Sequence, residues 1–246
     1  MSQGARSFFT TRWSVVLRAG QAGVGEGNEE RDARDALERL AEGYWLPLFA
    51  YVRRRGYDEE AARDLTQAFF ARLLERRDVA SATPEKGRFR SFLITALKNF
   101  LVNQEERERA LKRGGGRAPL SIDTEEAVGR LEGLPVDDET PERVFERAWA
   151  RAVLDRTLAR LAEQYAERGK TELFEALAEH LVGGSEGTPY AELAAELSLS
   201  VGAVKVAVHR LRARYREELR REIADTLADP GDVEDELRLL FEALGS

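Results

Sequence analysis

The chain has 246 residues, of which 43% are hydrophobic and 34% are charged, so it can form one large domain or two small ones. It contains no cysteine and only two histidines, which excludes disulfides, thiol nucleophiles and zinc fingers. The formal net charge is −7. No apolar run is long enough for a signal peptide or a membrane span, so we expect a cytoplasmic protein. We also expect no metal and no other cofactor.

The periodic segments predict helices, and we find no convincing pair of strands. In the first periodic segment Leu37, Leu40, Tyr44 and Leu48 follow helical spacing, and Pro47 is expected to kink or restart that helix. The sequence therefore predicts an all-α fold.

Two further helices complete the expected first domain. Asp58 can cap the first of them, which carries Ala62, Leu65, Phe69 and Leu73 on one face. The second helix is apolar on most sides and is expected at the centre of the core. Its apolar residues are Phe89, Phe92, Leu93, Ala96, Leu97 and Phe100. We expect the N-terminal segment "SFFTTRWSVVL" to pack on this domain.

Residues 114–139 predict a flexible acidic linker, because glycine and proline are frequent there and the segment ends in "DDE". Thr140 and Pro141 then form a typical cap and first-turn pair, and Thr188 and Pro189 repeat it. Two helices are expected between these pairs, with the apolar residues Leu154, Leu158, Leu161 and Tyr165 on one and Phe174, Leu177 and Leu181 on the other.

The stretch "YAELAAELSLSVGAVKVAVHRLRARYR" (190–216) predicts a short helix, a tight turn and a longer basic helix. Ser200 is the expected cap of the longer helix. Its apolar face is expected to contain Val201, Val204, Val208, Leu211, Tyr215 and Leu219. This arrangement is typical of a helix-turn-helix, and an ordinary helical hairpin with a solvated arginine face is the alternative.

In a helix-turn-helix, the start of the second helix enters the major groove of DNA. The residues that face away from the apolar stripe are then candidates for base edges: Gly202, Ala203, Lys205, Val206 and His209, together with the cap Ser200. The arginines further along are better placed for phosphates, which position a protein without reading sequence. They are Arg210, Arg212, Arg214 and Arg216.

Charge is distributed in alternating blocks. Residues 86–117 carry a net charge of +6 and residues 201–221 carry +5, whereas 122–146 carry −7 and 225–246 carry −6. The pattern indicates two surfaces that face nucleic acid, separated and followed by acidic segments. Ordinary solvated helix faces are the alternative.

The acidic C-terminal segment predicts one more amphipathic helix, with Val233, Leu237, Leu240 and Leu244 on its apolar face. Such a helix could dock on the basic helix of the helix-turn-helix and inhibit it. It could instead complete the second core, and we favour this second interpretation.

Three blocks, in this order, resemble extracytoplasmic-function (ECF) sigma factors, the smallest promoter-recognition subunits of bacterial RNA polymerase. They are "YWLPLFAYVRRRGYDEEAARDLTQAFFARLLE", "GRFRSFLITALKNFLVNQEERERALKR" and "PYAELAAELSLSVGAVKVAVHRLRARYREEL". The likeness covers about residues 35–113 and 140–221. It implies a transcription initiation factor whose partners are core RNA polymerase and promoter DNA, with no membrane and no catalytic residue.

The resemblance implies two small helical domains joined by the linker. Residues 1–113 would bind the polymerase clamp and melt the downstream promoter element, and 140–222 would read the upstream element with the helix-turn-helix. The linker 114–139 would lie in the polymerase channel or act as a plain spacer. Residues 223–246 would be an acidic extension.

The resemblance also implies site residues in the first domain. Asp64, Gln67 and Phe70 match the clamp-binding pattern of the family. The residues implied at the melted element are Arg88, Phe89, Arg90, Lys98, Asn99, Asn103 and Arg107. Phe89 has an equally weighted alternative as a core residue.

The clamp-binding helix departs from the family pattern, because Arg63, Thr66 and Ala68 stand where relatives carry acidic or apolar residues. Polymerase binding is therefore expected to be weaker than usual. One hypothesis is that a Ser/Thr kinase phosphorylates Thr66 and so restores negative charge, and a buried helix threonine is the alternative. An anti-sigma factor is the other candidate regulator.

Other function classes are less well supported. The glycine run "GGGR" lacks the strand and the Lys-Ser/Thr of a phosphate loop, and neither histidine has a partner at catalytic spacing, so we do not expect an enzyme. The main alternative is a free-standing helix-turn-helix regulator that acts without core polymerase. A sigma-like adaptor that binds a partner without DNA is a third possibility.

Overall fold

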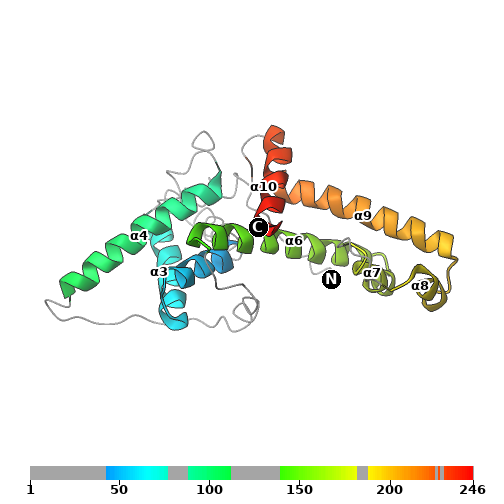
Figure 1. Cartoon of the computed structure of the whole chain (residues 1–246), viewed down its shortest axis with the longest axis horizontal. Coiled ribbons are helices and arrows are strands. Elements are labelled where there is room, and N and C mark those ends of the chain that lie inside the picture. The colour runs from blue at the N-terminus through cyan, green and yellow to red at the C-terminus, as the bar shows by residue number, and fades with distance from the viewer. Residues whose placement is uncertain are drawn as a thin grey trace, which may run out of the picture. The chain divides into compact units, whose positions relative to one another are not determined.

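The computed structural model describes residues 43–76, 88–111, 139–181, 188–224, 227 and 230–245 (Figure 1). Within these ranges the regular elements are helices and there is no strand, which confirms the predicted all-α class. None of the helices in these ranges combines the length and apolar character that a membrane span requires. The chain divides into two compact units, Met1–Ala152 with Ala224–Ser246, and Val153–Ile223.

The first unit contains a helical stretch at 43–54, α3 (Glu59–Arg76), α4 (Phe89–Leu111) and the start of α6 (Pro141–Ala166). Near its C-terminal end it adds the short 3-10 helix η4 (Pro230–Asp232) and α10 (Val233–Gly245). Residues 43–54 are helical on both sides of the buried Pro47, so the helix does not restart there.

The core of the first unit includes α4, as the sequence predicted, but α4 is buried on one face and not on most sides. Leu93, Leu97 and Leu101 are fully buried on that face. The ring of Phe100 meets that of Phe69 on α3 edge to face, with centroids 5.7 Å apart. Burial of these apolar side chains is the main stabilising contribution to such a unit.

Two capping predictions in the first unit are confirmed. The backbone N–H of Ala61 donates to Asp58 Oδ1 at 2.8 Å, and that of Arg143 donates to Thr140 Oγ1 at 3.3 Å. Glu139, placed in the flexible linker from sequence, is instead tied to the folded unit. Its carbonyl oxygen accepts from Arg54 Nε at 2.5 Å, and its carboxylate pairs with Arg147. The rest of the predicted linker, like the N-terminal segment, lies outside the described residues.

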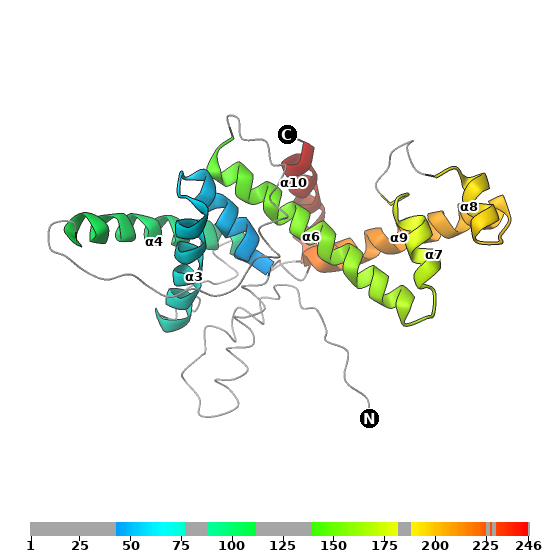
Figure 2. The same cartoon turned by 90° about the horizontal axis from the view of Figure 1, so that it is seen from below.

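The second unit contains the rest of α6, α7 (Thr171–Ala178), α8 (Tyr190–Glu196) and nearly all of α9 (Val201–Ala224). Figure 2 shows α7 and α8 beside the N-terminal half of α9. Its core joins all four helices through Leu161, Leu177, Leu193, Val204 and Leu211.

A second set of contacts joins α6 to α9 through charge. Glu218 and Glu222 of α9 are buried, and Glu222 accepts from Arg156 Nε at 3.0 Å and from Arg160 Nη1 at 3.3 Å. Gln164 Nε2 donates to Glu218 Oε1 at 3.1 Å. Each buried carboxylate therefore has a partner, which compensates for its loss of hydration.

The predicted cap at Thr188 is wrong. Its backbone N–H donates to Glu179 Oε1 at 2.8 Å, and α8 begins at Tyr190 without a side-chain cap. The carboxylate of Glu179 therefore holds the residues that precede α8, and this hydrogen bonding lowers the pKa of Glu179.

The expectation that the C-terminal helix completes the second core is also wrong, because α10 belongs to the first unit. Its residues Leu237 and Leu240 are buried, as predicted for an apolar face, but Glu236 is buried beside them. Glu236 pairs with Arg88 and Arg90 at the start of α4. A buried carboxylate requires a cationic partner, and α4 supplies two.

We expect Leu97→Ala to destabilise the protein by about 2–5 kcal/mol, because it leaves a cavity in a core where Leu97 is 0% exposed. The matched control is Val102→Ala on the same helix, where the side chain is 48% exposed. Its expected effect is about 0.5 kcal/mol or less. Urea unfolding followed by circular dichroism measures both, and equal effects would contradict this assignment of the core.

Candidate nucleic-acid interface

The start of α9 presents one polar face to solvent, and its position is set by a cap and a buried face. Ser200 caps the helix, since the backbone N–H of Ala203 donates to Ser200 Oγ at 3.1 Å. Val204, Val208 and Leu211 are buried against α6, α7 and α8. The expected base-contacting residues therefore lie exposed on the opposite side. They are Gly202, Ala203, Lys205, Val206 and His209, followed by the exposed Arg210.

One residue of the predicted apolar face is misplaced. Val201 is 41% exposed, at the start of the helix, and Leu199 in the preceding turn is exposed as well. Leu199, Val201 and Val206 are therefore three exposed apolar side chains on the turn and the first part of α9. The first helical turn lies beyond the edge of the core, so the apolar stripe starts at Val204.

The later arginines of α9 differ in their surroundings. Arg212 is partly buried, and its Nε donates to the carbonyl oxygen of His180 at 2.8 Å, so it ties α9 to the end of α7. The guanidinium of Arg214 lies 5.6 Å from the ring centroid of Tyr165 on α6, although the residue is exposed. Arg216 is exposed. Arg212 thus has a structural role that the sequence did not reveal.

The turn between α8 and α9 is tight and hydrogen-bonded. The backbone N–H of Leu199 donates to the carbonyl of Ala194 at 2.9 Å, which closes the C-terminal end of α8. Ser198 has φ of 53°, in the left-handed region that residues other than glycine seldom adopt. This turn sets the direction in which α9 leaves α8.

A second polar surface follows α4. Asn99, Asn103 and Arg107 are exposed at four-residue spacing, so they share one side of the helix. Asn103 Nδ2 donates to the carbonyl of Asn99 at 2.7 Å. Lys98 lies beside them and pairs with Glu142 of α6, with Nζ and Oε1 2.6 Å apart.

The structure buries two other residues that the resemblance placed at the melted element. Phe89 is 2% exposed, and its ring centroid lies 5.6 Å from that of Tyr44 and 5.9 Å from that of Phe92. Arg90 is 5% exposed, and desolvation lowers its pKa. Both side chains take part in the packing of the first unit. Their burial favours the core alternative for Phe89, whereas Arg88 keeps a partly exposed side chain.

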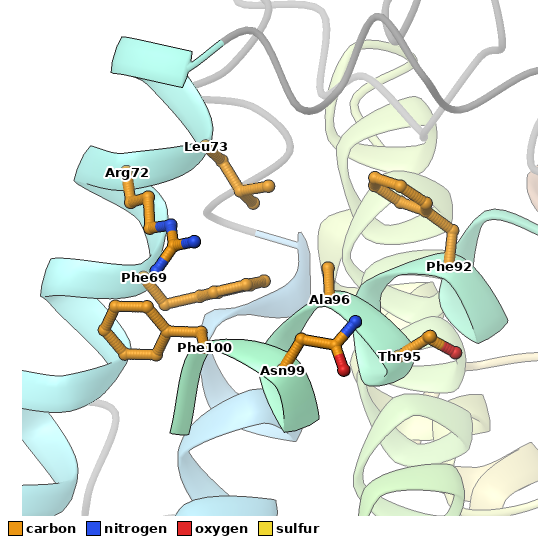
Figure 3. A pocket seen from close by; sticks show the side chains of 8 residues that line it. All are labelled: Phe69, Arg72, Leu73, Phe92, Thr95, Ala96, Asn99 and Phe100. Atoms are coloured by element: carbon orange, nitrogen blue, oxygen red, sulfur yellow. The ribbon is translucent and has the colours of Figure 1, made fainter. Parts of the chain in front are cut away.

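A cavity of about 260 Å³ opens between α3 and α4, next to this polar surface (Figure 3). The lining residues are Phe69, Arg72, Leu73, Phe92, Thr95, Ala96, Asn99 and Phe100. The guanidinium of Arg72 lies 5.6 Å from the centroid of the Phe100 ring. Aromatic faces, an amide and a cation therefore meet in one hollow, which is the chemistry that binds an unstacked base.

The candidate polymerase-binding residues lie on α3. Asp64 and Gln67 are partly exposed, whereas Phe70 is buried and its ring lies 5.9 Å from that of Phe69. Arg63 pairs with Glu59 at 2.9 Å. The carboxylate of Asp64 and the amide of Gln67 are therefore accessible to a partner, whereas the ring of Phe70 is part of the core.

Thr66 is 0% exposed, and its Oγ1 donates to the carbonyl of Ala62 at 2.7 Å. The burial of Thr66 favours the alternative interpretation, a buried helix threonine, over the phosphorylation hypothesis, because a kinase requires an accessible hydroxyl. A phosphate at this position would also have to be buried, and burial of its negative charge is costly.

Sequence reasoning missed Arg72 and the pairing of Glu236 with Arg88 and Arg90. The signal for Glu236 was present: it is an acid on the same helical face as Leu237 and Leu240, and a charge within an apolar stripe indicates a buried ion pair. The cavity had no such signal, because its lining comes from two helices separated in sequence. Among the described residues, no group of acidic or histidine side chains could hold a metal ion.

A family model described as "ECF sigma factor" matches residues 34–221, which is more than half of the chain. The chain belongs to the ECF sigma factor family. ECF sigma factors are DNA-binding transcription initiation factors, not enzymes, and they direct RNA polymerase to promoters. Neither the curated proteins nor the solved structures contain a significant match to this sigma factor.

We expect Ser198→Gly to be at least about 1 kcal/mol more stable than Ser198→Val. A left-handed conformation costs a residue with a Cβ atom about 1–2 kcal/mol, and a β-branched side chain is the least tolerant of it. Thermal and urea unfolding of this sigma factor measure the difference. If the two variants were equally stable, φ at this turn would not be positive in solution.

We expect Glu142→Gln to lower the free energy of unfolding by less than about 1 kcal/mol at pH 7, because the Lys98–Glu142 pair is partly exposed. The hydrogen bond between them lowers the pKa of Glu142 from 4.5 and raises that of Lys98 from 10.5. The stabilisation is therefore present at neutral pH. It is lost as pH falls through the lowered pKa of Glu142, or rises through the raised pKa of Lys98.

Urea unfolding at pH 7 and at pH 3 checks this sign. The difference between wild type and Glu142→Gln is expected to shrink in acid, whereas the exposed Glu163→Gln serves as a control for the change in net charge. A difference that grows in acid would contradict the pairing.

Proposed function

We propose that this sigma factor divides promoter binding between its two units. The exposed start of α9 reads the upstream promoter element, and the polar side of α4 with its neighbouring cavity holds the melted downstream element. The accessible residues of α3 contact the clamp of core polymerase. The observation that carries the proposal is the polar face at the start of α9, which a cap and a buried apolar face orient toward solvent.

The composition of that face fits reading in the major groove. Lys205 and His209 supply hydrogen-bond donors for base edges, and the exposed methyl groups of Val206 are suited to the methyl group of thymine. Gly202 and Ala203 allow the helix to approach the bases closely, because they have little or no side chain. Arg210 and Arg214 lie further along for phosphates, which set the register.

The cavity and the polar side of α4 have features that are suited to binding single-stranded DNA. Base stacking on aromatic side chains tolerates any sequence, and the partly exposed Phe92 supplies a ring at the cavity. The amide of Asn99 can bond the edge of an unstacked base, and Arg72 supplies positive charge. Asn103 and Arg107 extend the polar side of α4 beyond the cavity. We leave Phe89 out of this surface because it is buried.

The overall charge supports the requirement for polymerase. A net charge of −7 opposes non-specific attraction to DNA, so the two cationic surfaces act when polymerase holds them on a promoter. A free-standing regulator would instead bind its operator without polymerase.

The test uses purified core polymerase and run-off transcription from genomic fragments. We expect the wild-type chain to co-elute with core polymerase and to start transcription at a subset of fragments. Lys205→Ala combined with Arg210→Ala is expected to reduce that transcription at least about 10-fold, because each base or phosphate contact contributes about 1–3 kcal/mol. Co-elution with polymerase should not change.

The matched control is Arg168→Ala combined with Lys170→Ala, which removes two exposed cations from the turn before α7. It should leave transcription within about 2-fold of wild type, since most surface changes have small effects. Tight DNA binding by the chain alone, without co-elution with polymerase, would establish the free-standing regulator instead. Equal losses in both double variants would reject the assigned face.

A further inference from the structure

One carboxylate from the C-terminal helix holds both arginines at the start of α4. Glu236 Oε2 lies 2.7 Å from Arg88 Nε, and Oε1 contacts Arg90 Nη1. The Glu236 side chain is 2% exposed. These residues are about 150 positions apart in sequence, so the contact is purely tertiary.

The arginines form part of a built anion site. Arg90 lies at its base, 4.3 Å from the ring centroid of Trp149 and 2.8 Å from Glu146 Oε2. Arg88 lies at its edge with a side chain 37% exposed. The first turn of α4 contains no acid, so the partial positive charge of that helix end adds to the two guanidinium groups. Two guanidinium groups and a helix N-terminus favour a bidentate oxygen anion.

The helix that fills this site rests on few buried side chains. In α10 only Glu236, Leu237 and Leu240 are buried among its described residues, and Phe241 is 56% exposed. The surrounding segment 225–246 carries a net charge of −6. Figure 1 shows α10 near the N-terminal end of α4, the helix that we assign to the melted promoter element.

We propose that the Arg88–Arg90 turn binds a backbone phosphate of promoter DNA and that Glu236 occupies this site in the absence of DNA. The inference rests on the proposed function of α4. A phosphodiester and a carboxylate each carry one negative charge and two oxygens suited to arginine, so one can replace the other. The C-terminal helix is then an internal competitor that reduces DNA binding by the first unit until DNA displaces it.

This competition explains why the partly exposed Arg88 and the buried Arg90 pair with a carboxylate although the adjoining side of α4 is suited to DNA. A single DNA strand that contacts Arg107, Asn103 and Asn99 and continues toward the start of α4 would reach the Arg88–Arg90 turn. When Glu236 leaves, Arg90 keeps Glu146 as a partner and Arg88 gains a phosphate.

The first test measures binding of the full chain to a fluorescein-labelled single-stranded DNA of 20 nucleotides of mixed sequence. We expect Glu236→Gln to bind at least about 5-fold more tightly than wild type, as measured by fluorescence anisotropy. The slope of log K against log salt should become steeper by about 0.7, because one additional phosphate contact contributes about 0.7 on a single strand.

Asp235→Asn is the matched control, because it makes the same change in net charge one residue away. Asp235 is exposed and pairs with Arg238 on its own helix. This control should bind like wild type. In the Glu236→Gln background, Arg88→Ala should remove the gain in affinity. A gain that persists in the double variant, or that Asp235→Asn shares, overturns the proposal.

A second measurement needs no variant and decides the case even if Glu236→Gln folds poorly. Hydrogen exchange of the amides of residues 233–245 in the wild-type chain should increase when the single-stranded DNA is added to saturation. Inorganic phosphate at matched ionic strength should leave this exchange unchanged. If DNA does not change the exchange, α10 is not displaced and the proposal fails. If phosphate alone releases α10, the site binds small anions and its assignment to DNA fails.

These outcomes are separable from failure of the proposed function. Co-elution with core polymerase and the loss of transcription in the α9 double variant test the function without involving α10. Success there with no response of α10 to DNA would reject the competition alone.

Discussion

The burial of one face of each long helix determines which residues this sigma factor presents to its partners. In the first unit Leu93, Leu97 and Leu101 hold α4 in the core, so that Asn99 and Asn103 face solvent. In the second unit the buried Val204 plays the same part for α9 and leaves Lys205 exposed. Since a helix cannot rotate without exposing its apolar face, the polar faces are fixed by the cores behind them.

Buried ion pairs add specificity to this apolar packing. Glu222 accepts from two arginines of α6 in the second unit, and Arg90 lies between Glu146 and Glu236 in the first. Such pairs seldom add much net stability, because burial removes the hydration of both charges. They do penalise every arrangement that leaves a charge unpaired. In α10 this requirement directs the helix to the start of α4.

Helix caps and apolar helix faces could be predicted from the sequence where they depend only on residues close by in the chain. The caps at Asp58, Thr140 and Ser200 follow from side chains that bond the amide three residues ahead. The apolar face of α9 followed from its period, apart from Val201, where the helix extends past its core. The cap at Thr188 failed because Glu179, nine residues earlier, bonds its amide instead.

The sequence by itself determined the helical class, the family and the starts of three helices, because periodicity and capping act within a few residues. Only the tertiary structure decided that Phe89 and Thr66 are buried, that a cavity forms between α3 and α4, and that Glu236 faces Arg88. Each of these depends on which helix packs against which. Hydrophobic burial is non-directional, so a pattern that marks a face as buried does not identify the surface that covers it.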